Sequence, residues 1–188
     1  MHAHDPLLRW TAFPTPFGAV RLAWAERARG PQVIRIVLPG DTRGNRGEFS
    51  PVVFGNPVGN KKIRALINDI RSFLSGKNVV FSTEILELDR CRPFQQRVLL
   101  AEHAIPRGYV STYGRIARHL CVPGGARAVG NALAKNPFPV VIPCHRALRS
   151  DGSPGGFQGG AAMKVRLLEM EGASFLPDGK VRMERFWY

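Results

Sequence analysis

The chain has 188 residues, of which 44% are hydrophobic, so it can form one large domain or two small ones around a packed core. It carries 27 lysine and arginine residues against 14 acidic ones, and its formal net charge is +13. Its apolar runs fall short of the roughly 20 residues that a membrane span needs, and its first residues show no export signal. We therefore expect an intracellular protein, cytoplasmic or, in a eukaryote, nuclear, with no membrane partner.

The first 90 residues predict a small α/β domain. Polar and apolar residues alternate over 10–38 in the way that suits strands, and Ile63, Ile67 and Ile70 recur at helical spacing. This part contains no cysteine, which excludes a cysteine-bearing zinc site within it. In chain order we expect strands at 17–24 and 32–38, a polar loop at 41–51, a helix at 60–76 and a strand at 79–88.

The second part of the chain is richer in helical patterns. The last two of its predicted helices are separated by a short, glycine-containing turn, which is the pattern of a helix-turn-helix. A helical hairpin packed in a core is the alternative interpretation. The three helices are expected at 93–105, 111–120 and 126–136.

A basic stretch runs through this second part. Uncompensated positive charge of this kind suits a polyanion such as DNA or RNA, and a solvated basic face is the alternative. No acidic residue occurs between Glu102 and Asp151, whereas the interval holds Arg107, Arg115, Arg118, Arg127, Lys135, Arg146 and Arg149.

Small residues dominate the predicted helix at 126–136. A helix that reads base edges in the major groove normally carries longer polar side chains. A bare helix can instead approach closely within a minor groove, where it would read little sequence; an alanine-rich helix buried in a core is the alternative. Arg127 stands among Gly125, Ala126, Ala128, Gly130, Ala132 and Ala134, while Val129 and Leu133 are expected to pack inward.

Cys144 is the candidate nucleophile. Its spacing from the other two cysteines is that of neither a disulfide framework nor a zinc knuckle. Three prolines are expected to hold the apolar segment 137–143, which leads to it, extended and stiff. A thiol that titrates near ~8.5 needs a base, and the adjacent His145 can serve if a carboxylate such as Glu169 or Glu171 orients it. The alternative for such a pair is a buried structural thiol beside a surface histidine.

The stretches ARAVGNALAKNPFPVVIPCHR, GGFQGG and KVRLLEMEG resemble the O6-alkylguanine-DNA alkyltransferases. The resemblance is close over 93–172 and general over 10–90, and it does not cover 173–188. It implies an α+β fold: a ribonuclease-H-like α/β domain with a small antiparallel sheet over 1–90, then an α-rich, winged-helix-like domain with the helix-turn-helix over 91–188. It also implies DNA repair by direct reversal, in which the alkyl group moves irreversibly from a flipped base to the protein's own cysteine.

The resemblance further implies catalytic roles, one residue at a time. Cys144 would accept the alkyl group, and His145 would take up the thiol proton through a water. Glu171 would orient His145, and Asn136 would brace the turn and the active-site strand. Tyr113 would press on the phosphate of the target nucleotide and contact its base.

DNA-binding and pocket residues are implied in the same way. Arg127 would fill the gap that the flipped base leaves, and Ala126, Ala128 and Gly130 would line the minor-groove face. The backbones of Ala147 and Gln158 would bond the base. The substrate pocket would comprise Ala147, Gly155, Phe157, Gln158 and Gly159.

Three positions depart from the family pattern: Asn131 replaces a frequent glycine, Phe157 a common tyrosine and Gln158 a small residue of some members. The expected partner is double-stranded DNA that contains O6-alkylguanine, with O4-alkylthymine as a further candidate, and the protein is expected to act as a monomer with no cofactor and no metal. A lesion-binding relative without transfer, a helix-turn-helix regulator with a sensor thiol and a Cys–His hydrolase are the rival interpretations.

Overall fold

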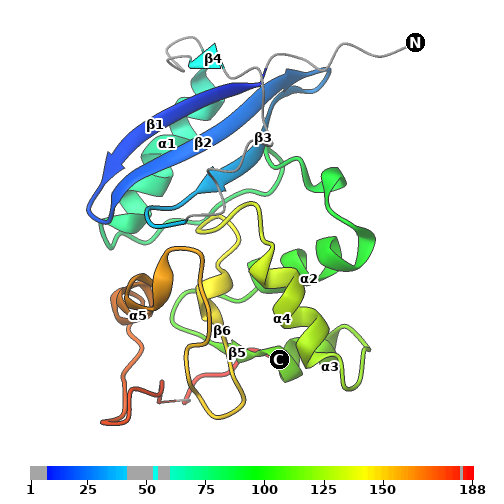
Figure 1. Ribbon diagram of the computed structural model, residues 1–188, viewed down its shortest axis with the longest axis vertical. Helices are drawn as coiled ribbons and strands as arrows, with labels where there is room; N and C mark the ends of the chain where they lie inside the picture. Colours follow the sequence, from blue (N-terminus) through cyan, green and yellow to red (C-terminus); the bar gives the residue numbers. More distant parts are fainter. Residues whose placement is uncertain (1–7, 42–52, 55–59, 183) are drawn as a thin grey trace. The chain divides into compact units, whose positions relative to one another are not determined.

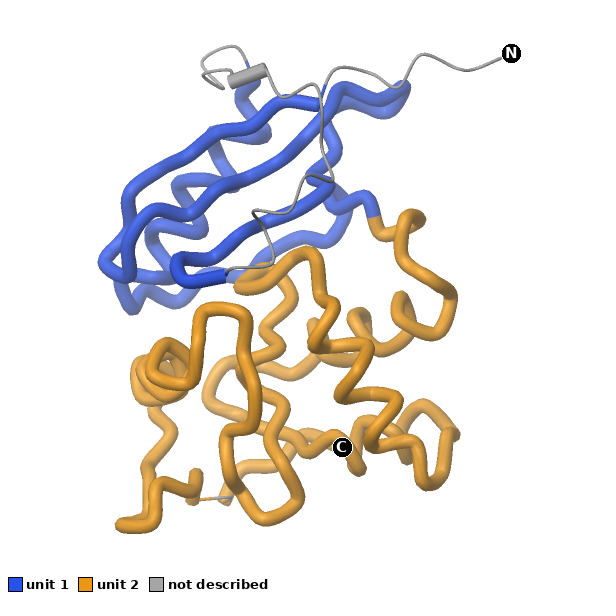
Figure 2. Tube along the Cα trace, viewed as in Figure 1, with its two compact units in different colours: residues 1–87 blue, residues 88–188 orange. Residues whose placement is uncertain are grey.

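The computed structural model describes residues 8–41, 53–54, 60–182 and 184–188. The chain divides into two compact units, residues 1–87 and residues 88–188 (Figure 2). The fold mixes helices with a small antiparallel sheet, as the sequence predicts. Apart from Asp41, the predicted polar loop at 41–51 lies outside the described residues.

A four-stranded sheet in the order β3-β2-β1-β4 forms the first unit (Figure 1). β1, β2 and β3 form an antiparallel meander, and β4 pairs in parallel with β1. Gly18 and Gly30 turn the chain between the long strands with φ of 111° and 101°, which other residues rarely adopt. The strands are β1 (Arg9–Thr15), β2 (Gly18–Arg27), β3 (Gly30–Val37) and β4 (Val53–Phe54).

Helix α1 (Lys61–Leu74) lies against the sheet of this unit (Figure 1) and confirms the helix predicted at 60–76. It begins at Asn60, whose side chain accepts from the backbone N–H of Lys62 at 3.1 Å and of Ile63 at 3.2 Å. Its apolar stripe is buried, with Ile63 and Ile70 at 0% exposure. Helical spacing and the asparagine cap therefore suffice to explain this element.

The strand predicted at 79–88 is wrong. Val80 is 91% exposed, and only the segment around Leu86 reaches the edge of β3. There, the N–H of Val33 donates to the carbonyl of Ile85 at 2.7 Å, and the N–H of Glu87 donates to the carbonyl of Val33 at 2.9 Å. A strand needs ladder hydrogen bonds along its length, and this segment has them at one position only.

Four α-helices and a two-stranded parallel sheet form the second unit (Figure 1). The predicted helices at 93–105, 111–120 and 126–136 are present as α2, α3 and α4, which pack on one another. The helices are α2 (Pro93–His103), α3 (Tyr113–His119), α4 (Ala126–Ala134) and α5 (Gly160–Met170), and the strands are β5 (Ser111–Thr112) and β6 (Ala147–Leu148). Short 3₁₀ helices, η3 (Leu88–Arg90) and η4 (Cys144–Arg146), complete the unit.

The C-terminal segment packs onto the start of the helix-turn-helix. The N–H of Trp187 donates to the carbonyl of Val110 at 2.9 Å. Tyr188 bonds both neighbouring helices: its hydroxyl donates to the carbonyl of Ala101 on α2 at 2.8 Å, and its carbonyl accepts from Arg115 on α3 at 2.5 Å. The segment therefore joins α2 and α3 at the point where Tyr113 begins the latter helix.

Candidate active site

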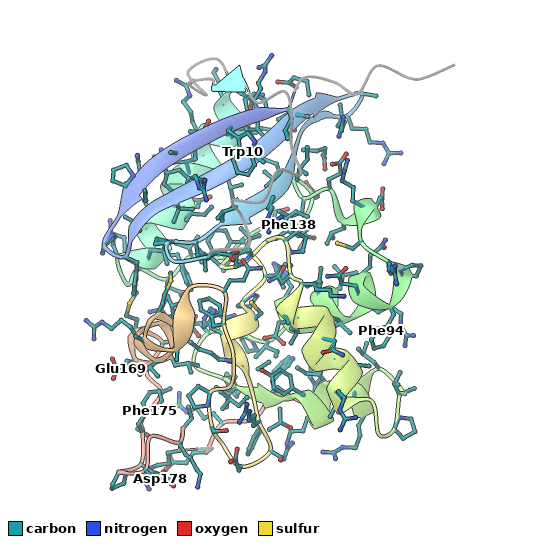
Figure 3. The ribbon with its side chains drawn as sticks, viewed as in Figure 1. Trp10, Phe94, Phe138, Glu169, Phe175 and Asp178 are labelled. Atoms are coloured by element: carbon teal, nitrogen blue, oxygen red, sulfur yellow. The ribbon has the colours of Figure 1, made fainter. Side chains whose placement is uncertain are left out.

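A tight turn, not the extended segment that the prolines predict, leads to Cys144. The N–H of Ile142 donates to the carbonyl of Phe138 at 2.8 Å, so the chain doubles back over this stretch. Val140 has φ of 77°, which is rare and strained for a β-branched residue. Phe138, labelled in Figure 3, is 1% exposed and anchors the turn. Proline limits its own φ but does not prevent a reversal at the residue that follows it.

Asn136 connects the end of α4 to this turn. It is fully buried, and its Nδ2 lies 3.2 Å from both the carbonyl oxygen of Ile142 and the Sγ of Cys144. Its Oδ1 accepts from the backbone N–H of Phe138 at 2.9 Å. One side chain thus contacts both sides of the turn and the sulfur of Cys144.

The thiol of Cys144 is protected from solvent, with the residue 7% exposed. Burial raises its pKa to about 11, although the hydrogen bond from Asn136 and the charge of Lys164 act in the opposite direction. A thiol in this state is almost entirely protonated at neutral pH. It therefore needs a base at the moment of reaction.

His145 and Glu171 form a buried pair in which the imidazole is chemically able to act as a base. His145 Nε2 lies 3.1 Å from Glu171 Oε1, and both residues are buried. Burial alone would raise the pKa of Glu171, but His145 and Arg146 outweigh it and hold that pKa at about 2. Because an ionised carboxylate only accepts, Nε2 carries the proton and Nδ1 is the basic nitrogen. Burial lowers the pKa of His145, which keeps the imidazole neutral and able to take up a proton.

The sequence analysis placed Arg146 in the basic stretch that would face a polyanion, and this prediction is wrong. Its Nε donates to Glu171 Oε2 at 2.8 Å and its Nη2 to Glu171 Oε1 at 2.6 Å. Its Nη1 donates to the carbonyl of Ile105 at 2.6 Å, and the residue is 7% exposed. The arginine thus fixes the carboxylate that orients His145, and it is not presented to a polyanion. Of the basic stretch, Arg118, Arg127, Lys135 and Arg149 are exposed.

Glu169, the other candidate carboxylate, lies on the outer side of α5 (Figure 3). It is exposed and pairs with Arg166 at 3.3 Å. Since α5 ends at Met170, Glu171 occupies the C-cap and turns back to the site instead. The structure therefore chooses between the two carboxylates that the sequence left open.

Tyr113 and the glycine-rich loop lie together. Tyr113 is the first residue of α3, which Thr112 caps by accepting from the N–H of Arg115 at 3.2 Å. Gly155 has φ of 71°, and a Cβ there would lie 3.0 Å from the tyrosine hydroxyl. A side chain at Gly155 would therefore disturb the approach of the loop to Tyr113.

Three further residues that the resemblance assigns to a substrate pocket make contacts within this unit. The ring of Phe157 stands edge-on to that of His145, with centroids 6.2 Å apart. Gln158 Nε2 donates to the carbonyl of Asn136 at 2.5 Å. A Cβ on Gly159 would lie 2.3 Å from the sulfur of Met163, so a side chain there would displace the flexible end of that methionine.

The outer face of α4 is bare, as the sequence predicts. Arg127, Ala128 and Asn131 are exposed, Ala126 and Gly130 are half-buried, and Val129 and Leu133 are buried. A Cβ on Gly130 would meet no atom within 4 Å, so packing inside the chain does not demand glycine at that position. The open space lies on the outer face, where a bound molecule can approach the backbone.

The sequence analysis did not predict two buried charged residues in this unit. Glu102 on α2 and Lys164 on α5 are both 0% exposed, and Lys164 Nζ donates to the carbonyl of Ala147 at 2.7 Å. Burial raises the pKa of Glu102 to about 8 and lowers that of Lys164 to about 8. Helical spacing was the available signal, because Glu102 follows Val98 by four positions on the buried face of α2.

The described residues hold no group of three or more histidine, cysteine, aspartate or glutamate side chains arranged for a metal ion. Among the helices of the described part, none is long and apolar enough to cross a membrane.

A buried thiol, an amide that contacts its sulfur and a histidine–carboxylate–arginine network lie in one unit with a helix-turn-helix, an arrangement that suits a cysteine nucleophile. Residues 93–173 match the family model described as 6-O-methylguanine DNA methyltransferase, DNA binding domain. A methylated-DNA–protein-cysteine methyltransferase of Mycolicibacterium paratuberculosis is 30% identical over 166 residues, which are 88% of this chain and 93% of that relative. The chain belongs to the family of methylated-DNA–protein-cysteine methyltransferases, as its resemblance predicted.

Other relatives match over less of their length. The enzyme of the same name from Methanothermobacter thermautotrophicus is 48% identical over 112 residues, 60% of this chain and 62% of that relative. In such pairs the match spans under two thirds of the relative. Among solved structures, Mycobacterium tuberculosis OGT in complex with DNA has a TM-score of 0.72 at 27% identity, over 87% of this chain and 92% of that one.

Proposed function

We propose that this protein repairs DNA by transferring the alkyl group of O6-alkylguanine to Cys144. The observation that carries the proposal is the sulfur itself, which is braced by Asn136 at 3.2 Å and adjoins the His145–Glu171 pair. His145 Nδ1 takes up the thiol proton, directly or through a water, and the thiolate attacks the alkyl carbon. The S–C bond forms as the C–O6 bond breaks, and the guanine leaves with the electron pair and gains a proton.

The product explains a single turnover. A thioether at Cys144 is stable to water, so the nucleophile is consumed and each molecule reacts once. The reaction needs no cofactor, because the alkylated base supplies the group and Cys144 accepts it.

We infer that double-stranded DNA binds along the outer face of α4. Arg127 and Ala128 are exposed there, and the open space above Gly130 suits close approach to a groove. Exposed basic residues that include Arg118 and Lys135 supply affinity for phosphates without sequence choice. This suits a protein whose target occurs at any sequence.

The base must leave the helix before the thiol can reach it, at a cost of a few kcal/mol. Arg127 fills the gap in the stack, and Tyr113 contacts the target nucleotide. The glycine-rich loop, through Gly155, Phe157, Gln158 and Gly159, walls the pocket together with Ala147. The placement of Phe157 against His145 and of Gly155 against Tyr113 supports this assignment.

We further propose the finer fold that the family resemblance implies. Residues 1–90 would form a ribonuclease-H-like domain, and residues 91–188 a winged-helix-like domain around the helix-turn-helix. The protein would act as a monomer inside the cell. O4-alkylthymine is the second substrate to test.

The decisive experiment is intact mass spectrometry after mixing the protein with a duplex that contains one O6-methylguanine. We expect a gain of one methylene on nearly every molecule, and no gain with the unmodified duplex or in Cys144→Ser. Tight binding to the lesion duplex without a mass gain would overturn the proposal and indicate a protein that marks damage.

A further inference from the structure

Helix α3, which begins with Tyr113, is too short to hold its own position. It has seven residues, and its buried ones are Ile116 and Ala117. An isolated helix of this length is marginal in water, so its place depends on contacts with neighbouring elements. A shift of α3 would move the hydroxyl of Tyr113 away from Gly155, beside which it lies.

The C-terminal segment 185–188, which the family resemblance does not cover, lies along the strand that leads into α3. The N–H of Val110 donates to the carbonyl of Arg185 at 3.0 Å, and the N–H of Trp187 donates to the carbonyl of Val110 at 2.9 Å. The next residue, Ser111, pairs with Ala147 of β6. Because neighbouring residues of a strand direct their backbone hydrogen bonds to opposite edges, β5 lies between β6 and the segment.

Side chains of the segment also contact α3 itself. The guanidinium carbon of Arg115 lies over the ring of Phe186, 4.0 Å from its centroid, which suits a cation–π contact. The same guanidinium donates to the carbonyl of Tyr188 at 2.5 Å. At the last residue of α3, the ring of His119 stacks on that of Tyr188 with centroids 3.7 Å apart. The segment therefore contacts α3 near its start and at its end.

We propose that the segment 185–188 is a positioning element for alkyl transfer, which holds Tyr113 where it contacts the target nucleotide. The inference rests on the proposed reaction at Cys144. Tyr113 lies at the junction of β5 and α3, and the segment bonds both elements. Two residues before Tyr113, Ser111 Oγ donates to the carbonyl of Trp187 at 2.8 Å. The segment thus acts on the nucleotide only through Tyr113.

Two phenylalanines provide a matched pair of variants for the test. Phe175 and Phe186 are both half-buried, and both pack against one core cluster. The cluster consists of Val110, Leu148, Leu168 and Val181. Of the two rings, that of Phe186 lies under Arg115 of α3. Phe175→Ala and Phe186→Ala therefore remove the same ring from the same cluster, but Phe186→Ala also removes a contact with α3.

The test measures the rate of methyl transfer from a saturating duplex that contains one O6-methylguanine, by intact mass spectrometry of quenched samples. Phe186→Ala should slow transfer by about tenfold, and deletion of 185–188 should slow it further, since misplacement by ~1 Å can cost about a hundredfold. Phe175→Ala should transfer at nearly the wild-type rate. In a Tyr113→Ala background, Phe186→Ala should cause no further loss, because changes that act through one contact are not additive.

Iodoacetamide, used without DNA, should modify Cys144 at the same rate in each variant, and a changed rate would overturn the inference because the segment would then act on the thiol. Equal slowing by Phe175→Ala and Phe186→Ala, or a full additional loss in the Tyr113→Ala background, would also overturn it. If the deletion does not fold, the two phenylalanine variants still decide. Failure of the proposed function would show differently, because the wild type itself would take no methyl group from the duplex.

Discussion

The two units of the molecule treat charge in opposite ways. Among its described residues, the 1–87 unit buries a single charged side chain, Asp41, and its sheet and α1 enclose an apolar core. Within its described part, the 88–188 unit buries five acidic or basic side chains in or beside the site: Glu102, His145, Arg146, Lys164 and Glu171. Buried charges that lack partners destabilise a fold, so their concentration in one unit marks where chemistry, not packing, selects the residues.

Within the second unit the buried charges are themselves of two kinds. Glu171 and Arg146 satisfy one another through two hydrogen bonds, and the carboxylate also reaches His145. Glu102 has no such partner. The first group holds the imidazole of His145 in place, and Glu102 is a buried acid outside that network. Variants that remove one charge at a time should therefore affect stability and reactivity in different proportions.

The largest effect on stability should come from breaking the pair of Arg146 and Glu171. Glu171→Leu leaves a buried guanidinium uncompensated and should lower the free energy of unfolding by about 3–5 kcal/mol. The double variant Arg146→Leu/Glu171→Leu should recover part of that loss, while alkyl transfer stays absent because His145 is no longer held. Urea unfolding can follow Trp187, the only tryptophan of this unit, in a Trp10→Phe/Trp24→Phe background. Equal instability of the single and double variants would contradict the pairing.

Removal of Glu102 should raise the free energy of unfolding at alkaline pH, whereas removal of Glu171 lowers it. The pKa of Glu102 rises to about 8 on folding, so its contribution to stability is full below the ordinary pKa near 4.5 and is lost as pH rises through 8. Glu102→Leu abolishes this loss, so the stability of the variant relative to the wild type should increase between pH 5 and pH 8. Thermal unfolding at both pH values is the measurement, and a pH-independent difference would refute the sign.

An amide in each unit offers a matched comparison. Asn136→Ala deprives the buried N–H of Phe138 of its acceptor and should cost about 1–3 kcal/mol. The variant should also slow methyl transfer, because the hydrogen bond that the native Asn136 donates lowers the pKa of Cys144. Asn60→Ala, which removes the cap of α1, should cost a similar 0.5–2 kcal/mol or so without changing the transfer rate. Equal rates in both variants would show that contact with the sulfur is immaterial.

The smallest effect on stability should accompany a clear effect on repair. Arg127→Ala and the control Arg64→Ala each remove one exposed arginine, and each should change stability by less than about 0.5 kcal/mol. Only Arg127→Ala should slow transfer from the lesion duplex, by roughly tenfold or more. In this variant no side chain fills the gap that the flipped base leaves between its stacked neighbours, so flipping is less favourable. Transfer from free O6-methylguanine base should be unchanged. A loss with the free base would assign Arg127 to the pocket instead.

Elements that depend on local pattern could be predicted from the sequence. The stripe of isoleucines and the asparagine cap suffice for α1, and the glycine-containing turn separates α3 from α4. Cys144 and His145 could be named because their chemistry is distinctive, whereas that chemistry left Glu169 and Glu171 as alternatives and only the family resemblance named Glu171. The order of the strands and the position of β4 depend on contacts far apart in sequence, which pattern does not reveal.

The errors have a common physical origin. Arg146 looked like a surface residue because arginine is usually exposed, and only the tertiary position of Glu171 shows why it is buried. The reversal at Val140 needs a backbone conformation that local preference disfavours, so the surrounding contacts must impose it. The segment at 79–88 has strand-like composition but lacks a partner along most of its length.

The attachment of Tyr188 to both α2 and α3 has a consequence for the order of events during synthesis. Translation produces α2 and the helix-turn-helix long before Tyr188, so the helices emerge from the ribosome without the residue that joins them. Glu171, which orients His145, also follows Cys144 by 27 positions. The nascent chain therefore carries its thiol before the base is held and before the helices are tied. The contacts that join α2 to α3 through Tyr188 can therefore form only after Tyr188 has been made.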